Sequence, residues 1–240
     1  ARAAGLDRLA GSGDLPLAPF TEGSRDSLLM PLSQPLAQYF ALLAECGERQ
    51  AQQEIRLQAG PLLIEDWLTD LRGSNADPRR LVLHTGRLKD RFDKVTPEWT
   101  LHLAACAAGH PLTTHLQGQD GRLTLPPLAR DAAQEHLDRI GQAWRQALCE
   151  PLPIACATAF AWLKGEEKDN GEYEARKQFE SGFMHTGEQE KEPALARAWT
   201  DFDALLAPRH GDLRAFEYWT VQLYAPLYAH AQWHEPGEPA

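Results

Sequence analysis

Apolar residues recur at helical spacing in the first strongly patterned segment of the chain, DSLLMPLSQPLAQYFALLAEC (residues 26–46). The residues that share this spacing are Leu28, Leu29, Leu32, Leu36, Phe40 and Leu43. Pro31 and Pro35 lack the amide hydrogen that a helix interior requires, so the pattern predicts a continuous helix only after them. Residues 1–25 are rich in Gly, Pro and small side chains, which predicts an irregular segment.

Three strands are predicted next, from the segments QEIRLQA, PLLIEDWLTDL and RLVLHT. Thr96 and Pro97 then form an N-cap and first-turn pair for a helix that ends at Gly109. The segment LTTHLQGQDGRLTL reads as two strands joined by a turn at residues 119–121. The predicted order is therefore helix, three strands, helix, strand.

The second half of the chain is predicted to be helical. In the helix that follows Pro126 and Pro127, the apolar stripe consists of Ala133, Leu137, Ile140, Trp144 and Leu148. Residues 165–192 carry many charges and predict a solvated helix-and-loop excursion. The chain closes with an aromatic-rich helix interrupted near Pro226, whose rings are expected in the core. The predicted division is an irregular segment (1–25), an α/β core (26–125) and a helical extension packed on it (126–240).

Composition narrows the possible functions. The 240 residues carry a formal net charge of −10, so binding to nucleic acid would require a local basic patch. The four cysteines form no Cys-X-X-Cys pair and suggest reduced thiols in a cytoplasmic protein. No apolar run is long enough for a membrane span, and the start of the chain suggests a piece of a longer polypeptide.

The element order is that of a restriction-endonuclease-like, or PD-(D/E)XK-type, α/β (α+β) core. Such a core binds Mg²⁺ through an acid on its second strand and an acid-X-Lys on its third. The predicted third strand reads LVLHTGRLK, and the residue two positions before Lys89 is Arg87, which would repel a metal ion. The second strand keeps Asp66 and Asp70, for which solvent-facing or turn-capping roles are favoured. We therefore expect the core without its active site, and no metal or cofactor.

Several longer segments together resemble the C-terminal domain of RecC, the gamma subunit of exodeoxyribonuclease V. They are LLIEDWLTDLR, RLVLHTGRLKDRFDKVTPEWTLHLAACAAG, GRLTLPPL, PLPIACATAFAWL and ARKQFESGFMHTGEQEKEPALARAWTDFDAL. The resemblance implies a nuclease-like fold without catalytic residues that helps to part DNA strands. It also implies RecB-like and RecD-like partner subunits, in a helicase-nuclease that processes double-strand breaks. No catalytic residue is carried over.

The most basic part of this acidic chain supplies the candidate contacts with DNA or with an acidic partner surface. They are Arg79, Arg80, Arg87, Lys89, Arg91 and Lys94. The alternative is a solvated segment with scattered ion pairs. Two further functions stay open: an active metal-dependent nuclease of the same fold, and a pure protein-docking module. His230 and His234 have the spacing of a zinc pair but lack a third ligand, so a terminal surface pair is favoured.

Overall fold

The computed structural model describes residues 8, 11–12, 20–183 and 185–236 of the chain. The elements are α2 (Thr21–Glu45), β1 (Gln53–Ala59), β2 (Leu62–Leu68), β3 (Leu71–Ser74), β4 (Asp77–Leu83), the 3₁₀ helix η1 (Phe92–Lys94), α3 (Thr96–Ala107), β5 (Thr113–Gln117), β6 (Arg122–Leu125), α4 (Arg130–Ala147), α5 (Cys156–Glu166), α6 (Gly171–Phe179), α7 (Glu188–Lys191), α8 (Pro193–Ala198), α9 (Phe202–Leu206), β7 (Arg209–His210), β8 (Leu213–Arg214), α10 (Ala215–Leu223), α11 (Ala225–His230) and β9 (Gln232–His234). No helix among these residues is both long and apolar enough to cross a membrane.

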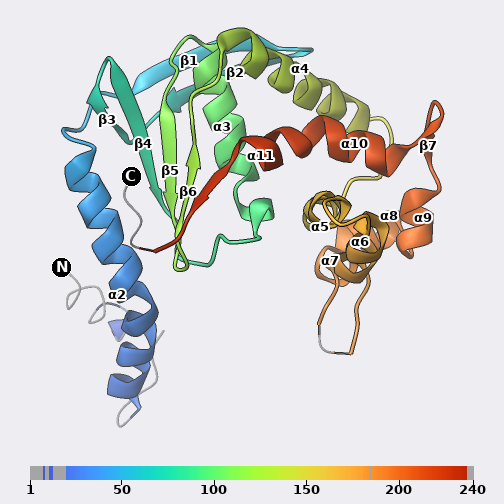
Figure 1. Cartoon of the computed structure of the whole chain (residues 1–240), viewed down its shortest axis with the longest axis horizontal. Coiled ribbons are helices and arrows are strands. Elements are labelled where there is room, and N and C mark those ends of the chain that lie inside the picture. Colours follow the sequence, from blue (N-terminus) through green and yellow to red (C-terminus); the bar gives the residue numbers. More distant parts are fainter. Residues whose placement is uncertain (1–7, 9–10, 13–19, 184, 237–240) are drawn as a thin grey trace.

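A five-stranded mixed sheet with the order β3-β4-β5-β6-β9 forms the centre of the molecule (Figure 1). Its strands are antiparallel except for β4 and β5, which run parallel and are connected through α3. Helix α3 packs its buried residues, Trp99 and Leu103 among them, against one face of the sheet. Helix α2 lies on the other face, where Leu42 and Cys46 pack on Leu81. The molecule therefore belongs to the mixed α/β, or α+β, class.

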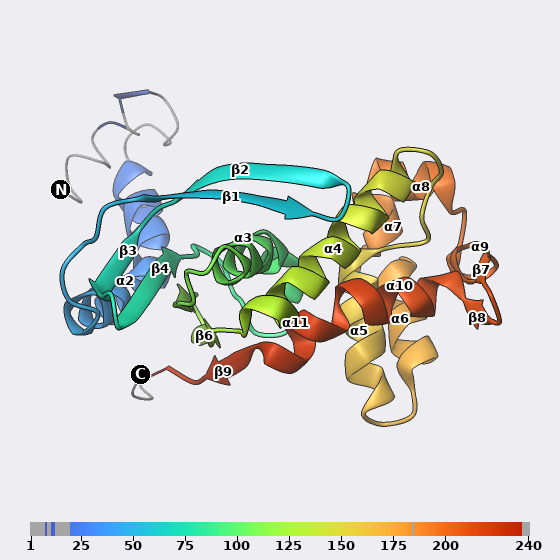
Figure 2. The same cartoon turned by 90° about the horizontal axis from the view of Figure 1, so that it is seen from above.

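The strands β1 and β2 form a separate antiparallel hairpin (Figure 2). The hairpin extends over α3 and α4, and its side chains Ile55, Ala59 and Leu68 are buried in the main core. The sequence predicted β1 and β2 correctly in outline but continued the second strand to Leu71. The structure ends β2 at Leu68 and starts the new strand β3 at Leu71, because the chain turns at Asp70 with φ = 59°.

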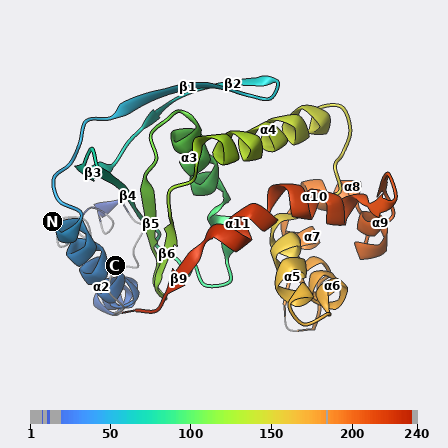
Figure 3. The ribbon, with the colours of Figure 1, turned by 45° about the horizontal axis from the view of Figure 1, so that its top comes forward.

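The helical elements of the second half lie to one side of the sheet (Figure 3). A second cluster of buried side chains, including Phe179, Phe202 and Phe216, holds these helices together. The prediction of an all-helical second half is wrong in one respect. After α11 the chain returns to the sheet, where β9 pairs antiparallel with β6, and β7 and β8 form a small hairpin.

Three details of the predicted helices need correction. Helix α2 begins at Thr21 and runs through Pro31 and Pro35, and the remainder of the predicted irregular segment lies almost wholly outside the described residues. Thr96 is inside α3 rather than its N-cap, and its hydroxyl donates to the carbonyl of Asp93 at 3.0 Å.

The predicted stripe of α4 fails at its C-terminal end. Ala133 and Leu137 are buried, whereas Trp144 and Leu148 are 51% and 67% exposed. Ala143 is buried instead, in a cluster with Ala215 and Trp219 of α10. The buried face thus changes along the helix, because α4 leaves α3 and meets α10 on another side. The late aromatic residues were predicted to be core, and none of Phe216, Tyr218, Trp219, Tyr224, Tyr228 and Trp233 is classed as exposed.

The close approach of α4 to β1 depends on Gly141. This residue is buried, and a methyl group added there would overlap the carbonyl oxygen of Ala59. We expect Gly141→Ala to lower the free energy of unfolding by about 1–3 kcal/mol, because the helix must move away from the hairpin. Urea denaturation measures the effect.

A matched control is Gly23→Ala in α2, where an added methyl group meets nothing within 4 Å. In that exposed position the better helix propensity of Ala is expected to add about 0.5–1 kcal/mol. A Gly141→Ala variant that gains stability like the control would contradict the packing argument.

Candidate functional site

The predicted basic segment does not form one continuous surface. Arg79 and Arg80 are consecutive residues of β4, so their side chains point to opposite faces of the sheet. Arg80 is buried, and its guanidinium contacts the carboxylate of Glu98 on α3 at 2.5 Å. Arg79 lies on the α2 face, pairs with Asp77 at 2.8 Å, and its hydrogen bond to that carboxylate raises its pKa. The charge of Arg80 is therefore removed from the surface.

The other four predicted contacts lie in the loop between β4 and α3, residues 84–95. Lys89 pairs with Glu235 at 2.5 Å, and the hydrogen bond to this carboxylate raises the pKa of the lysine. Arg91 and Lys94 both approach Asp93, at 3.1 and 3.5 Å. Arg87 is exposed and has no ion pair within the described part of the chain. An exposed pair such as Lys89–Glu235 contributes little to stability, about 0–1 kcal/mol, so a phosphate can replace that carboxylate at small cost.

The acids of the predicted second strand stand apart from this loop. Asp66 is exposed on the hairpin strand β2, and its carboxylate accepts the amide hydrogen of Trp67 at 2.7 Å. Asp70 is in the turn before β3 and lies 3.6 Å from Arg49. The described residues contain no group of three or more His, Cys, Asp or Glu placed to hold a metal ion. Asp66 and the strand β4 belong to different sheets.

The two C-terminal histidines do not share a helical face. His230 ends α11, whereas His234 lies in β9, and both side chains are half-buried rather than on the open surface. The ring nitrogen Nε2 of His230 lies 2.6 Å from the carbonyl oxygen of Pro126. Nε2 of His102 lies 3.0 Å from the same oxygen. The contact of His230 attaches α11, and that of His102 attaches α3, to the start of the helical extension, which is a structural role.

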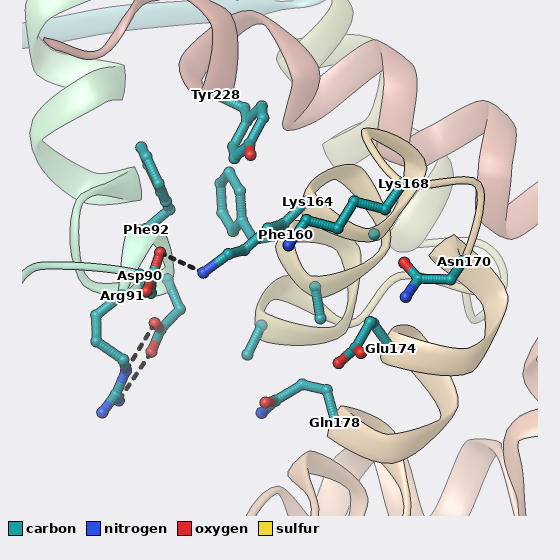
Figure 4. A pocket seen from close by; sticks show the side chains of 14 residues that line it. Asp90, Arg91, Phe92, Phe160, Lys164, Lys168, Asn170, Glu174, Gln178 and Tyr228 are labelled. Carbon is teal, nitrogen blue, oxygen red and sulfur yellow. Dashed lines mark hydrogen bonds and ion pairs between the residues drawn. The ribbon is translucent and has the colours of Figure 1, made fainter. Parts of the chain in front are cut away.

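A cleft lies where the loop after β4 meets the helical extension (Figure 4). Its volume is about 340 Å³. The residues that line it come from η1 and its preceding loop, from α5, α6 and the turn between them, and from α11; they are Asp90, Arg91, Phe92, Asp93, Ala157, Phe160, Ala161, Lys164, Gly165, Lys168, Asn170, Glu174, Gln178 and Tyr228. The predicted contact residue Arg91 thus forms part of the rim of a cleft.

Carboxylates partly neutralise the cations of this cleft. Lys164 pairs with Asp90 at 2.8 Å, which links α5 to the loop, and Arg91 pairs with Asp93. Lys168 and Glu174 have no ion pair within the described residues. One free ammonium group and one free carboxylate therefore face the same space.

Most of the cleft was not predicted from the sequence, because residues 165–192 were interpreted as a solvated helix-and-loop excursion. A signal was present: Asn170, Glu174 and Gln178 are four residues apart and so share one face of a helix. Lys164 and Lys168 have the same spacing. What the sequence did not provide was the opposite wall, because Phe92 and Tyr228 come from segments far apart along the chain.

The structure is an α+β domain with a helical extension, and a cleft of mixed charge lies between them. A family model described as RecC C-terminal domain matches residues 1–167. The chain belongs to this family, which confirms the resemblance found in the sequence. A search of curated proteins found no matching relative.

Proposed function

We propose that the chain is a noncatalytic part of a RecBCD-type helicase-nuclease, in which it positions DNA strands and holds RecB-like and RecD-like subunits during double-strand-break repair. Family membership supports a place in that complex. The observation that carries the noncatalytic role is the lack of a carboxylate at the end of β4, where Asp70, in the turn before the neighbouring strand β3, would need a partner. Asp66 is on another sheet, and the end of β4, from Leu81 to Leu83, has no carboxylate.

The proposal includes a degenerate restriction-endonuclease-like core. A mixed sheet in which α3 connects the parallel strands β4 and β5 is compatible with such a core. We keep the division into a core, residues 26–125, and a helical extension, residues 126–240, with β9 as the strand that the extension returns to the sheet. A role in DNA repair would imply a cytoplasmic location. The free cysteines are compatible with a reducing compartment.

The cations of the loop after β4 are proposed as the DNA contacts. Arg87, Lys89, Arg91 and Lys94 are exposed side chains within one short loop. Arg87 has no ion pair among the described residues, and the exposed carboxylate paired with Lys89 is exchangeable. Arg79 is half-buried and offers a weaker contact, whereas Arg80 is assigned to the core. Contacts of this kind with phosphates depend on salt, because each one releases condensed counterions.

The test is binding of the chain to forked DNA by fluorescence anisotropy over a range of salt concentrations. We expect the triple variant R87Q/K89Q/K94Q to bind at least about tenfold more weakly at low salt. The slope of log K against log salt is expected to fall by about two to three, because each lost phosphate contact contributes nearly one.

The matched control neutralises three exposed arginines away from the loop, Arg145, Arg197 and Arg209, none of which has an ion pair within the described residues. Both triple variants change the net charge equally. Equal losses of affinity would mean that total charge, and not the loop, determines binding. Absence of binding to any DNA would favour the pure docking module.

A cleavage assay with the same protein distinguishes the noncatalytic proposal from the active-nuclease alternative. We expect no cleavage of single-stranded or forked DNA in Mg²⁺ or Mn²⁺ above a chelator control. Cleavage that disappears in the chelator and in the D66N/D70N variant would identify an active metal site and refute the proposal.

A further inference from the structure

One face of α6, with the residue before it, lines the cleft with hydrogen-bond acceptors. Figure 4 shows the side chains of Glu174 and Gln178 on this helix, and of Asn170 in the turn before it, at the cleft. The Oδ1 atom of Asn170 is buried and has no hydrogen-bond partner among the described residues. Buried polar atoms are nearly always satisfied, so this oxygen is a candidate acceptor for a donor from outside the chain. The Glu174 carboxylate four residues on adds a second acceptor.

The opposite wall is aromatic. Phe92 stacks on Phe160 with ring centroids 5.1 Å apart, and Tyr228 lies 5.4 Å from Phe92. The hydroxyl of Tyr228 donates to Glu167 at 2.6 Å, which fixes the ring in place. An apolar wall facing a few convergent polar groups is typical of small-molecule sites, and the volume of about 340 Å³ falls in the size range of such sites.

The third element of the cleft is a cation that lines it. Lys164 is held by Asp90, whereas the ammonium group of Lys168 has no ion pair within the described residues (Figure 4). The cleft therefore offers an apolar wall, a row of acceptors and a free cation. A nucleotide matches these three features through its base plane, its base edge and its phosphate.

We propose that this cleft binds one nucleotide of a single DNA strand and prefers a base with an exocyclic amino group. The inference rests on the proposed role in positioning DNA strands and specifies a site for it. The amino group of cytosine or adenine donates to Asn170 Oδ1 and to the Glu174 carboxylate, and Lys168 contacts the phosphate. Thymine and uracil present a carbonyl oxygen at the corresponding position, which the carboxylate repels.

The experiment compares the affinities of the chain for dC12 and dU12, two pyrimidine strands that differ at the base edge. We expect dC12 to bind about tenfold more tightly, since one good base-edge contact discriminates by this order. Glu174→Gln is expected to reduce the preference to less than twofold, because an amide can rotate to present either a donor or an acceptor. Lys168→Gln is expected to weaken both strands equally. The control Glu54→Gln removes an exposed carboxylate on β1 and is expected to retain the preference.

The outcomes separate this inference from the proposed function. If neither strand binds, the nucleotide site is refuted, and the forked-DNA assay decides separately on strand positioning. If both strands bind equally, or if Glu174→Gln keeps the full preference, the nucleotide site is refuted while strand positioning by the loop cations stands. Equal binding of the two strands would instead indicate that the acceptors of α6 bind a donor-rich side chain of a protein partner.

Discussion

Between pH 6.5 and about 4 the free energy of unfolding is expected to fall steeply, because two buried histidines must become charged. Burial lowers the pKa of His102 and of His115 to about 4 in the folded protein. In the unfolded chain both titrate near about 6.5, so the unfolded state binds more protons in this interval and gains stability relative to the folded one. One pKa unit corresponds to about 1.4 kcal/mol, so each histidine removes about 3 kcal/mol by pH 4.

The structure explains why these two rings are kept neutral. Nδ1 of His102 lies 3.0 Å from the hydroxyl of Thr114, and its other nitrogen contacts the Pro126 carbonyl. Nδ1 of His115 lies 3.1 Å from the hydroxyl of Thr124. Among the described residues, no carboxylate is hydrogen-bonded to either ring to stabilise its charged form.

Urea denaturation at several pH values measures this effect, and the interval from pH 6.5 to 5.5 is the informative one, because most carboxylates titrate below it. We expect the H102Q/H115Q variant to show a flatter dependence on pH there. If the free energy of unfolding fell equally with pH in the parent chain and in the double variant, other groups would be the cause of the acid lability.

How far the sequence predicts the fold depends on the length and pattern of each element. The alternation in β1 and the turn between β5 and β6 are local signals, and both were predicted. The strand β9 has only three residues and exists because it can pair with β6 at the sheet edge. Such a strand has no pattern of its own, so the sequence reading extended the preceding helix over it.

The candidate site shows the same limit. The sequence showed that residues 79–94 are rich in cations. It was not recognised that Arg79 and Arg80, as neighbours on β4, point to opposite faces of the sheet. That outcome follows from alternation along β4 and could have been deduced once the strand was assigned. The cleft could not have been deduced from the sequence. It forms because η1 and α6 lie close together, and only tertiary packing determines that proximity.

The assignment of Arg80 to the core rests on a partly buried ion pair. Its side chain is 9% exposed, that of Glu98 is 25% exposed, and the Nε atom of Arg80 is buried without a hydrogen-bond partner. The Glu98 carboxylate is thus the group that compensates a buried positive charge between β4 and α3. Removing one member of such a pair is far more costly than removing both, because the remaining charge loses its partner.

Glu98→Ala is therefore expected to lower the free energy of unfolding by about 3 kcal/mol, at the lower end for a broken buried pair because Glu98 is partly solvated. The double variant R80M/E98L replaces both charges with apolar groups and is expected to recover most of this loss. Urea denaturation of the parent, the single variant and the double variant measures both changes. The double variant should also bind forked DNA within about twofold of the parent, because Arg80 has no charge at the surface to offer a phosphate. If the double variant folds stably but loses as much DNA affinity as R87Q/K89Q/K94Q, Arg80 would have to be a DNA contact after all.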